Sequence, residues 1–124
     1  MKCKYEKKIT VPLGEYGELV YIWRSNLRNV LLEFSISYRT EVYGKWYTTR
    51  RHCWTQHQNR FHTHVRVGLG RKRFKKVYPP PIRGSVREAL NWAKRDMVNN
   101  WYRYLKNFEK IVKNIDKEAN EKEK

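Results

Sequence analysis

The alternation that decides the fold lies in residues 30–42, Val30-Leu31-Leu32-Glu33-Phe34-Ser35-Ile36-Ser37-Tyr38-Arg39-Thr40-Glu41-Val42. Every second residue from Val30 to Tyr38 is apolar, and the residues between them are mainly polar. Successive side chains of a β-strand point to opposite faces of a sheet. The pattern therefore predicts a long strand with one packed face and one polar face, as in a sheet that is covered on one side only.

Further strands are predicted on both sides of this one. Upstream, residues 5–13 and 18–24 flank a turn that contains two glycines, which indicates a hairpin. Downstream, Gly44 marks a turn into residues 46–54, and residues 60–67 follow. The basic residues 71–78 predict an edge strand or arm, in which lysines also deter edge-to-edge pairing.

One long helix is predicted to follow the triple proline at 79–81. Residues 85–88, Ser-Val-Arg-Glu, form a capping box. Apolar residues then recur at steps of three and four: Val86, Leu90, Ala93, Met97, Trp101, Leu105, Phe108, Val112 and Ile115. This amphipathic stripe is typical of a helix packed on a core.

These elements predict an α+β fold, an antiparallel β-meander of five to six strands with one long C-terminal helix packed on one face. We expect one domain over residues 1–115. Residues 116–124 are nearly all charged, and we expect them to form a frayed tail.

The charge of the chain is strongly one-sided. Its 124 residues have a formal net charge of +16, and no Asp or Glu occurs between Val42 and Arg87. Such an excess attracts polyanions, of which nucleic acid is the commonest. The sequence therefore predicts a nucleic-acid partner, with RNA favoured, although a solvated cationic surface is the alternative.

Composition also bears on localisation. The first ten residues are charged and lack the apolar core of a secretory signal, and no apolar run is long enough to span a membrane. Cys3 and Cys53 are far apart, without C-x-x-C spacing. A reduced cytoplasmic protein is the simplest interpretation, and a disulfide between the two cysteines stays open.

All four histidines fall within residues 50–66. In a strand over residues 60–67, His62 and His64 share one face with Arg60 and Arg66, and the intervening residues share a mostly apolar face. We expect the histidine face to lie in water, away from the helix.

The register of the preceding strand depends on the lengths of two turns. A short turn at Gly44 would place one row on the polar face of Glu33: Trp46, Thr48, Arg50, His52 and Trp54. A five-residue loop over residues 56–60 would then set His52 opposite His64 and Trp54 opposite His62. A one-residue slip would invert this arrangement.

The first chemical interpretation is metal-independent cleavage of RNA. Histidines titrate near neutral pH and can exchange protons with a ribose hydroxyl and a leaving oxygen, and arginines hold phosphate. The predicted catalytic residues are His62, His64, His52 and Glu33. The predicted nucleic-acid-binding residues are Arg50, Arg51, Trp54, Arg60, Arg66, Arg71, Lys72, Arg73, Lys75 and Lys76.

Three other interpretations stay open. His62 and His64 could bind a metal with His52, Cys53 or Glu33 as a third ligand, but the surrounding cations disfavour a divalent ion, so no metal and no cofactor is predicted. The sheet could bind nucleic acid without cleavage, with Trp46 and Trp54 stacking bases, or these tryptophans could face an oligomer partner, such as a homodimer mate. The basic face could also contact an acidic protein or anionic lipid.

The layout resembles one known family. Trp23-Arg24 in a basic meander, Phe61-His62-Thr63-His64, and a capped C-terminal helix together resemble the small TumE-like toxins of toxin–antitoxin modules, over about Leu19 to Leu105. That family usually has a Tyr-Asp-Asn-like segment before the histidines, and no Asp stands there in this chain. The resemblance implies a cytoplasmic ribonuclease-like toxin with an acidic antitoxin partner.

Overall fold

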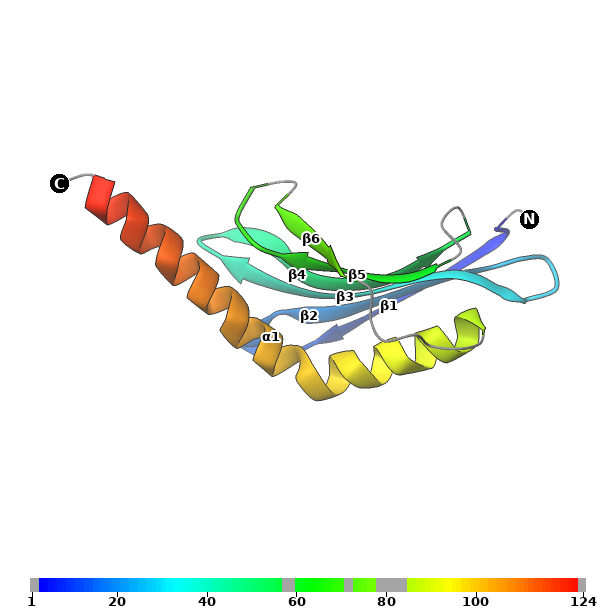
Figure 1. Cartoon of the computed structure of the whole chain (residues 1–124). Helices are drawn as coiled ribbons and strands as arrows, with labels where there is room; N and C mark the ends of the chain where they lie inside the picture. Colours follow the sequence, from blue (N-terminus) through cyan, green and yellow to red (C-terminus); the bar gives the residue numbers. More distant parts are fainter. Residues whose placement is uncertain (1–2, 57–59, 71–72, 78–84, 123–124) are drawn as a thin grey trace.

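The described part of the chain forms one open sheet with one long helix across one of its faces (Figure 1). The computed structural model describes residues 3–56, 60–70, 73–77 and 85–122. The strands are β1 (Tyr5–Pro12), β2 (Glu18–Ser25), β3 (Leu31–Val42), β4 (Lys45–Thr55), β5 (Arg60–Arg66) and β6 (Phe74–Val77). A 3-10 turn, η1, spans Gly14–Tyr16, and the helix α1 spans Val86–Lys122. The predicted α+β fold is confirmed.

The six strands are antiparallel and lie in the order of the sequence, so each pairs with its sequence neighbours. The turn between β3 and β4 is a two-residue turn, because Val42 pairs with Lys45. Tyr43 and Gly44 both have positive φ angles, of 52° and 76°. This is the backbone of a type I′ hairpin turn, whose twist matches that of the flanking strands.

A β-bulge at Thr49 sets which residues of β4 face the helix. Arg39 pairs with Thr48 and Tyr38 pairs with Arg50, so Thr49 is an extra residue in β4. The Thr49 hydroxyl donates a hydrogen bond of 3.2 Å to the carbonyl oxygen of Tyr38. Because an extra residue reverses the alternation of side chains, every β4 residue from Arg50 onward lies on the opposite face from the one predicted.

The connection from β4 to β5 adds a second shift. Thr55 pairs with Arg60, so residues 56–59 make the connection, one residue fewer than predicted. His52 therefore lies opposite Thr63 and not opposite His64. The predicted register of β4 is wrong, and its residues Arg50, His52 and Trp54 face α1.

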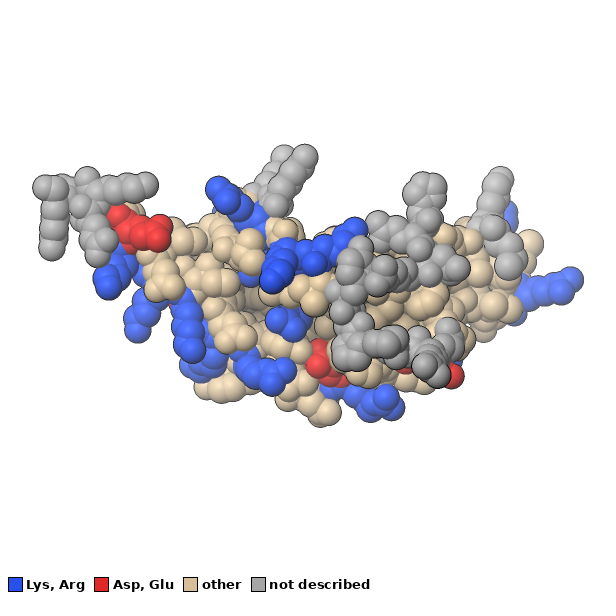
Figure 2. Space-filling model, viewed as in Figure 1, with Lys and Arg blue, Asp and Glu red and all other residues tan. Residues whose placement is uncertain are grey.

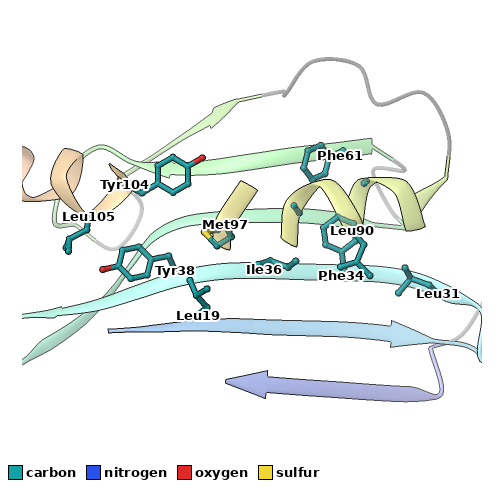
Figure 3. Close-up of a cluster of buried hydrophobic side chains, with 12 residues drawn as sticks. Leu19, Leu31, Phe34, Ile36, Tyr38, Phe61, Leu90, Met97, Tyr104 and Leu105 are labelled. Carbon is teal, nitrogen blue, oxygen red and sulfur yellow. The ribbon is translucent and has the colours of Figure 1, made fainter. Parts of the chain in front are cut away.

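The core lies between the sheet and α1 (Figure 3). Ile36 and Tyr38 of β3 are fully buried there, as are Ala93 and Met97 of α1. The predicted apolar stripe of the helix packs on this core, which also contains Leu19, Leu31, Phe34, Phe61, Ala89, Leu90, Tyr104 and Leu105. Burial of these side chains is the main force that holds the helix on the sheet.

The start of α1 has the predicted cap, and its end extends further than predicted. At the start, the hydroxyl oxygen of Ser85 accepts a hydrogen bond of 3.4 Å from the backbone N–H of Glu88, as the capping box predicts. At the far end the helix continues to Lys122, through much of the segment expected to fray. The Tyr43 hydroxyl donates a hydrogen bond of 2.6 Å to Asp116. This contact ties the distal half of α1 to the β3–β4 hairpin, and strong helix formers such as Lys and Glu extend the last turns.

Candidate functional site

The face of the sheet turned away from α1, here called the outer face, carries the histidine pair. Phe61 and Thr63 of β5 point to the helix side: Phe61 contacts Trp92 edge to face, with ring centroids 5.4 Å apart. Since side chains alternate along a strand, His62 and His64 lie on the outer face, as predicted. The strand pairings place two rows across this face, Ser35–Cys53–His62 and Ser37–Arg51–His64–Lys76.

The second row places one histidine between two cations. Arg51 of β4 and Lys76 of β6 are exposed, and His64 between them is partly buried. Burial, followed by the charges of Arg51, His62 and Lys76, lowers the pKa of His64 to about 4. His64 is therefore a neutral imidazole at pH 7 and a weak base.

The first row forms a compact cluster with His64. The side-chain ligand atoms of Cys53, His62 and His64 all lie within 4.8 Å of one another. The two imidazole rings are nearly perpendicular, with centroids 5.0 Å apart. Cys53 and His62 are only 7% and 4% exposed, so the expectation that both histidines lie in water is wrong for His62. Burial raises the pKa of the Cys53 thiol, although the nearby Arg51 and Lys76 oppose that shift.

His52, predicted to be catalytic beside His64, lies instead beneath α1. It is 1% exposed. Its Nδ1 lies 2.7 Å from Thr63 Oγ1, and its Nε2 lies 2.7 Å from Asp96 Oδ2. The same carboxylate accepts hydrogen bonds from the Tyr104 hydroxyl at 2.6 Å and from Asn100 Nδ2 at 3.0 Å. These residues form a polar network inside the helix–sheet interface, on the opposite side of the sheet from His62.

The pKa of Asp96 reflects this network. Burial acts to raise it, but the hydrogen bonds from His52 and Tyr104 outweigh burial and bring the pKa of the carboxyl below its ordinary value. The sequence-based prediction did not include Asp96 and Tyr104. A pattern that could have indicated them is the recurrence of Asp96, Asn100 and Tyr104 at steps of four, beside the apolar stripe of the helix.

Three predicted nucleic-acid-binding residues make contacts within the protein. The Arg50 guanidinium lies 3.7 Å from the centroid of the Tyr104 ring, on the helix side. Trp54 packs against the core. Arg66 is 8% exposed, and its guanidinium donates hydrogen bonds to the carbonyl oxygens of Thr48, at 2.6 Å, and of two glycines. The reversed face of β4 explains the placement of Arg50 and Trp54, and the three carbonyl oxygens hold the guanidinium of Arg66.

Glu33 lies on the outer face, as predicted, but its contacts are structural. Its carboxylate accepts a hydrogen bond of 2.9 Å from the backbone N–H of Gln56 and one of 3.4 Å from the Cys3 thiol. The Arg24 guanidinium lies 3.9 Å from it. These contacts bind β3 to β2 and to the end of β4. Cys3 and Cys53 are both free thiols.

Three more of the predicted nucleic-acid-binding residues lie at or beside β6, at the edge of the sheet. Arg73, Lys75 and Lys76 are exposed there. The side chain of Arg60 and residues Arg71 and Lys72 lie outside the described residues. Trp46, predicted as a stacking platform, is 46% exposed, and the Arg39 guanidinium lies 5.4 Å from its ring centroid.

Within the described part of the chain, no helix has an apolar stretch long enough to cross a bilayer.

Comparisons with known proteins identify a family and nothing more specific. No curated protein matches the chain significantly. No solved structure does so either. A family model, described as a domain of unknown function (DUF7718), matches residues 4–114. Since that match covers most of the 124 residues, the chain belongs to the DUF7718 family.

Proposed function

We propose that this protein binds RNA through the outer face of β4, β5 and β6. The observation that supports the proposal is the row Arg51–His64–Lys76, in which two exposed cations flank an imidazole from neighbouring strands. Adjacent strands lie about 4.8 Å apart, so the row spans about 10 Å of open sheet. Guanidinium and ammonium groups at that spacing can contact phosphates along a single strand.

The charge around this row supports an anionic partner. β4, β5 and β6 contain no Asp or Glu, and Arg73 and Lys75 add exposed cations at the β6 edge. In Figure 2, Lys and Arg side chains project from both the sheet and α1, while acidic atoms are visible at few places. A field of one sign accelerates and strengthens the binding of a polyanion.

Binding is better supported than cleavage by His62 and His64. A general acid or base must reach the atoms between which protons move. His62 is 4% exposed, and His64, with a pKa of about 4, is a weak base. His52 is enclosed beneath α1. We therefore propose RNA binding without proton transfer by these histidines. The ribonuclease activity that the resemblance to TumE-like toxins implies is the alternative, and the experiment below distinguishes the two.

The test is a binding titration with a fluorescently labelled single-stranded RNA at several salt concentrations, with and without EDTA. The double variant Arg51→Ala/Lys76→Ala should bind more weakly. Each phosphate contact on a single strand contributes about 0.7 to the slope of log K against log salt, so losing two contacts should flatten that slope by about 1.4. The matched control is Arg95→Ala/Lys117→Ala, which removes two exposed cations from α1.

The outcomes separate the alternatives. Equal losses in both double variants would show that affinity comes from diffuse charge, and the proposed face would be wrong. No RNA binding even at low salt, with tight binding of an acidic protein, would overturn the proposal in favour of a protein partner. Cleavage products that disappear in His62→Ala or His64→Ala would show that the acid–base interpretation was correct.

A further inference from the structure

We propose that Cys53, His62 and His64, the Cys–His–His cluster, form a Zn²⁺ site on the outer face. Within the described residues they are the one group of three metal-ligating side chains whose ligand atoms lie close together, all within 4.8 Å of one another. β4 supplies the thiol, and β5 supplies both imidazoles. Cys53 lies directly opposite His62 in the ladder, and His64 follows two residues later on the same face.

The geometry needs only a small contraction to hold the ion. Zn–S bonds of about 2.3 Å and Zn–N bonds of about 2.0 Å place tetrahedral ligand atoms about 3.4 Å apart. The ligand atoms of the cluster lie within 4.8 Å, so rotation about the side-chain bonds can close the difference. The nearly perpendicular imidazole rings, 5.0 Å apart, can direct one nitrogen each toward a common point.

The donor set selects the metal. One thiolate and two imidazoles suit Zn²⁺, whereas Mg²⁺ and Ca²⁺ need oxygen ligands. On binding, the Cys53 thiol releases its proton to solvent and its sulfur bonds to the ion. The thiolate lowers the charge of the bound site to +1. Arg51 and Lys76 still oppose that charge, so we expect affinity only for ions that form a strong bond to sulfur.

Burial makes the site closed on one side and open on the other. Cys53 and His62 are 7% and 4% exposed, and such burial protects a metal–thiolate bond from water. His64 is partly buried and lies between the exposed side chains of Arg51 and Lys76. Three protein ligands leave a fourth position for water or an anion, and the exposed side at His64 is where that ligand would enter.

The test is a titration of the metal-free protein with Co²⁺, an optical substitute for Zn²⁺. One Co²⁺ per chain should bind, with the visible bands of tetrahedral cobalt and a near-ultraviolet charge-transfer band from thiolate to cobalt. Adding Zn²⁺ should remove both sets of bands. His62→Ala or His64→Ala should weaken binding by more than about 100-fold, because even changes beyond the ligands cost 10–100-fold.

The two cysteines provide a matched pair of controls. Cys53→Ser should abolish the charge-transfer band, and Cys3→Ser should leave it unchanged. In the folded Cys3→Ser variant, Zn²⁺ should slow alkylation of Cys53, a measurement that does not require a stable Cys53 variant. A charge-transfer band that is lost in Cys3→Ser, octahedral cobalt spectra, or unchanged alkylation with Zn²⁺ would each overturn the proposal.

The proposals of a metal site and of RNA binding are tested independently. The cobalt titration contains no RNA, and the RNA titration is carried out both with and without EDTA. The metal site goes beyond the proposed function, and it differs from the expectation that the surrounding cations disfavour a divalent ion.

Discussion

Asp96 is the residue on which the polar contacts of the helix–sheet interface converge. Its carboxylate accepts hydrogen bonds from Tyr104 and Asn100 of its own helix and lies 2.7 Å from His52 of the sheet. No buried side-chain nitrogen or oxygen among the described residues lacks a partner. Because such groups are costly when unpaired, this network should favour one position of α1 along the sheet.

The first prediction concerns the charge of this residue. Asp96→Asn should lower the free energy of unfolding at pH 7 by about 2 kcal/mol, since hydrogen bonds to charged groups contribute about 1.5–3 kcal/mol. Asp116→Asn is the matched control, because Asp116 also accepts a hydrogen bond of 2.6 Å from a tyrosine, but on the exposed surface. We expect it to cost less than about 0.5 kcal/mol.

The contribution of the Asp96 charge to stability should depend on pH. The pKa of Asp96 is lower in the folded protein than its ordinary value of 3.8. Its contribution to stability is therefore complete above pH 3.8 and is lost as pH falls through the folded-state pKa. Urea denaturation of the unmodified protein and of the Asp96→Asn variant should show the difference between them shrinking at acid pH. A difference that stays constant into strong acid would contradict the role of the charge.

Among the elements, β4 shows what the sequence could and could not determine. The alternation of residues 30–42 and the helix stripe were sufficient for the meander and the helix, and the alternation of residues 60–67 for the outward face of His62 and His64. No sequence pattern predicts the bulge at Thr49, because threonine is common in regular strands and its neighbours are ordinary strand residues. That one residue exchanged His52 for Cys53 on the outer face and thereby changed the candidate site.

The connection between β1 and β2 carries a prediction about close backbone approach. Gly17 has a φ of 110°, and a Cβ there would overlap the carbonyl oxygen of Arg39 in β3. Gly17→Ala should therefore force β2 and β3 apart and cost more than about 3 kcal/mol, from backbone strain and the clash together. Chemical denaturation measures this loss.

Gly44 is the matched control for Gly17. Its φ is also positive, at 76°, but apart from the glycine and its two chain neighbours no heavy atom lies within 4 Å of the position of an added Cβ. Gly44→Ala should cost about 1–2 kcal/mol, the strain of a left-handed backbone alone. Equal losses at the two glycines would show that the close approach of β3 to Gly17 has no energetic consequence.

Over the whole molecule, the charge of +16 opposes the compact state. Exposed ion pairs offset little of it: Arg24–Glu6 and Lys106–Glu109 are pairs of the kind that contribute at most about 1 kcal/mol each. Self-repulsion among the remaining cations is relieved when the chain unfolds and the charges separate. Binding of a polyanion would relieve it without unfolding, which links the stability of this protein to its proposed partner.

The last prediction follows from this balance. Added NaCl screens charges beyond about 10 Å at 0.1 M, so the melting temperature in EDTA should rise from low to moderate salt. If screening recovers about 1 kcal/mol, the rise is about 4 °C for a chain of this size. The Arg95→Ala/Lys117→Ala variant, with two fewer cations, should melt higher at low salt and gain less from NaCl. A melting temperature that falls with salt would show instead that ion pairs outweigh repulsion in the folded protein, which would contradict the proposed link between its charge and its stability.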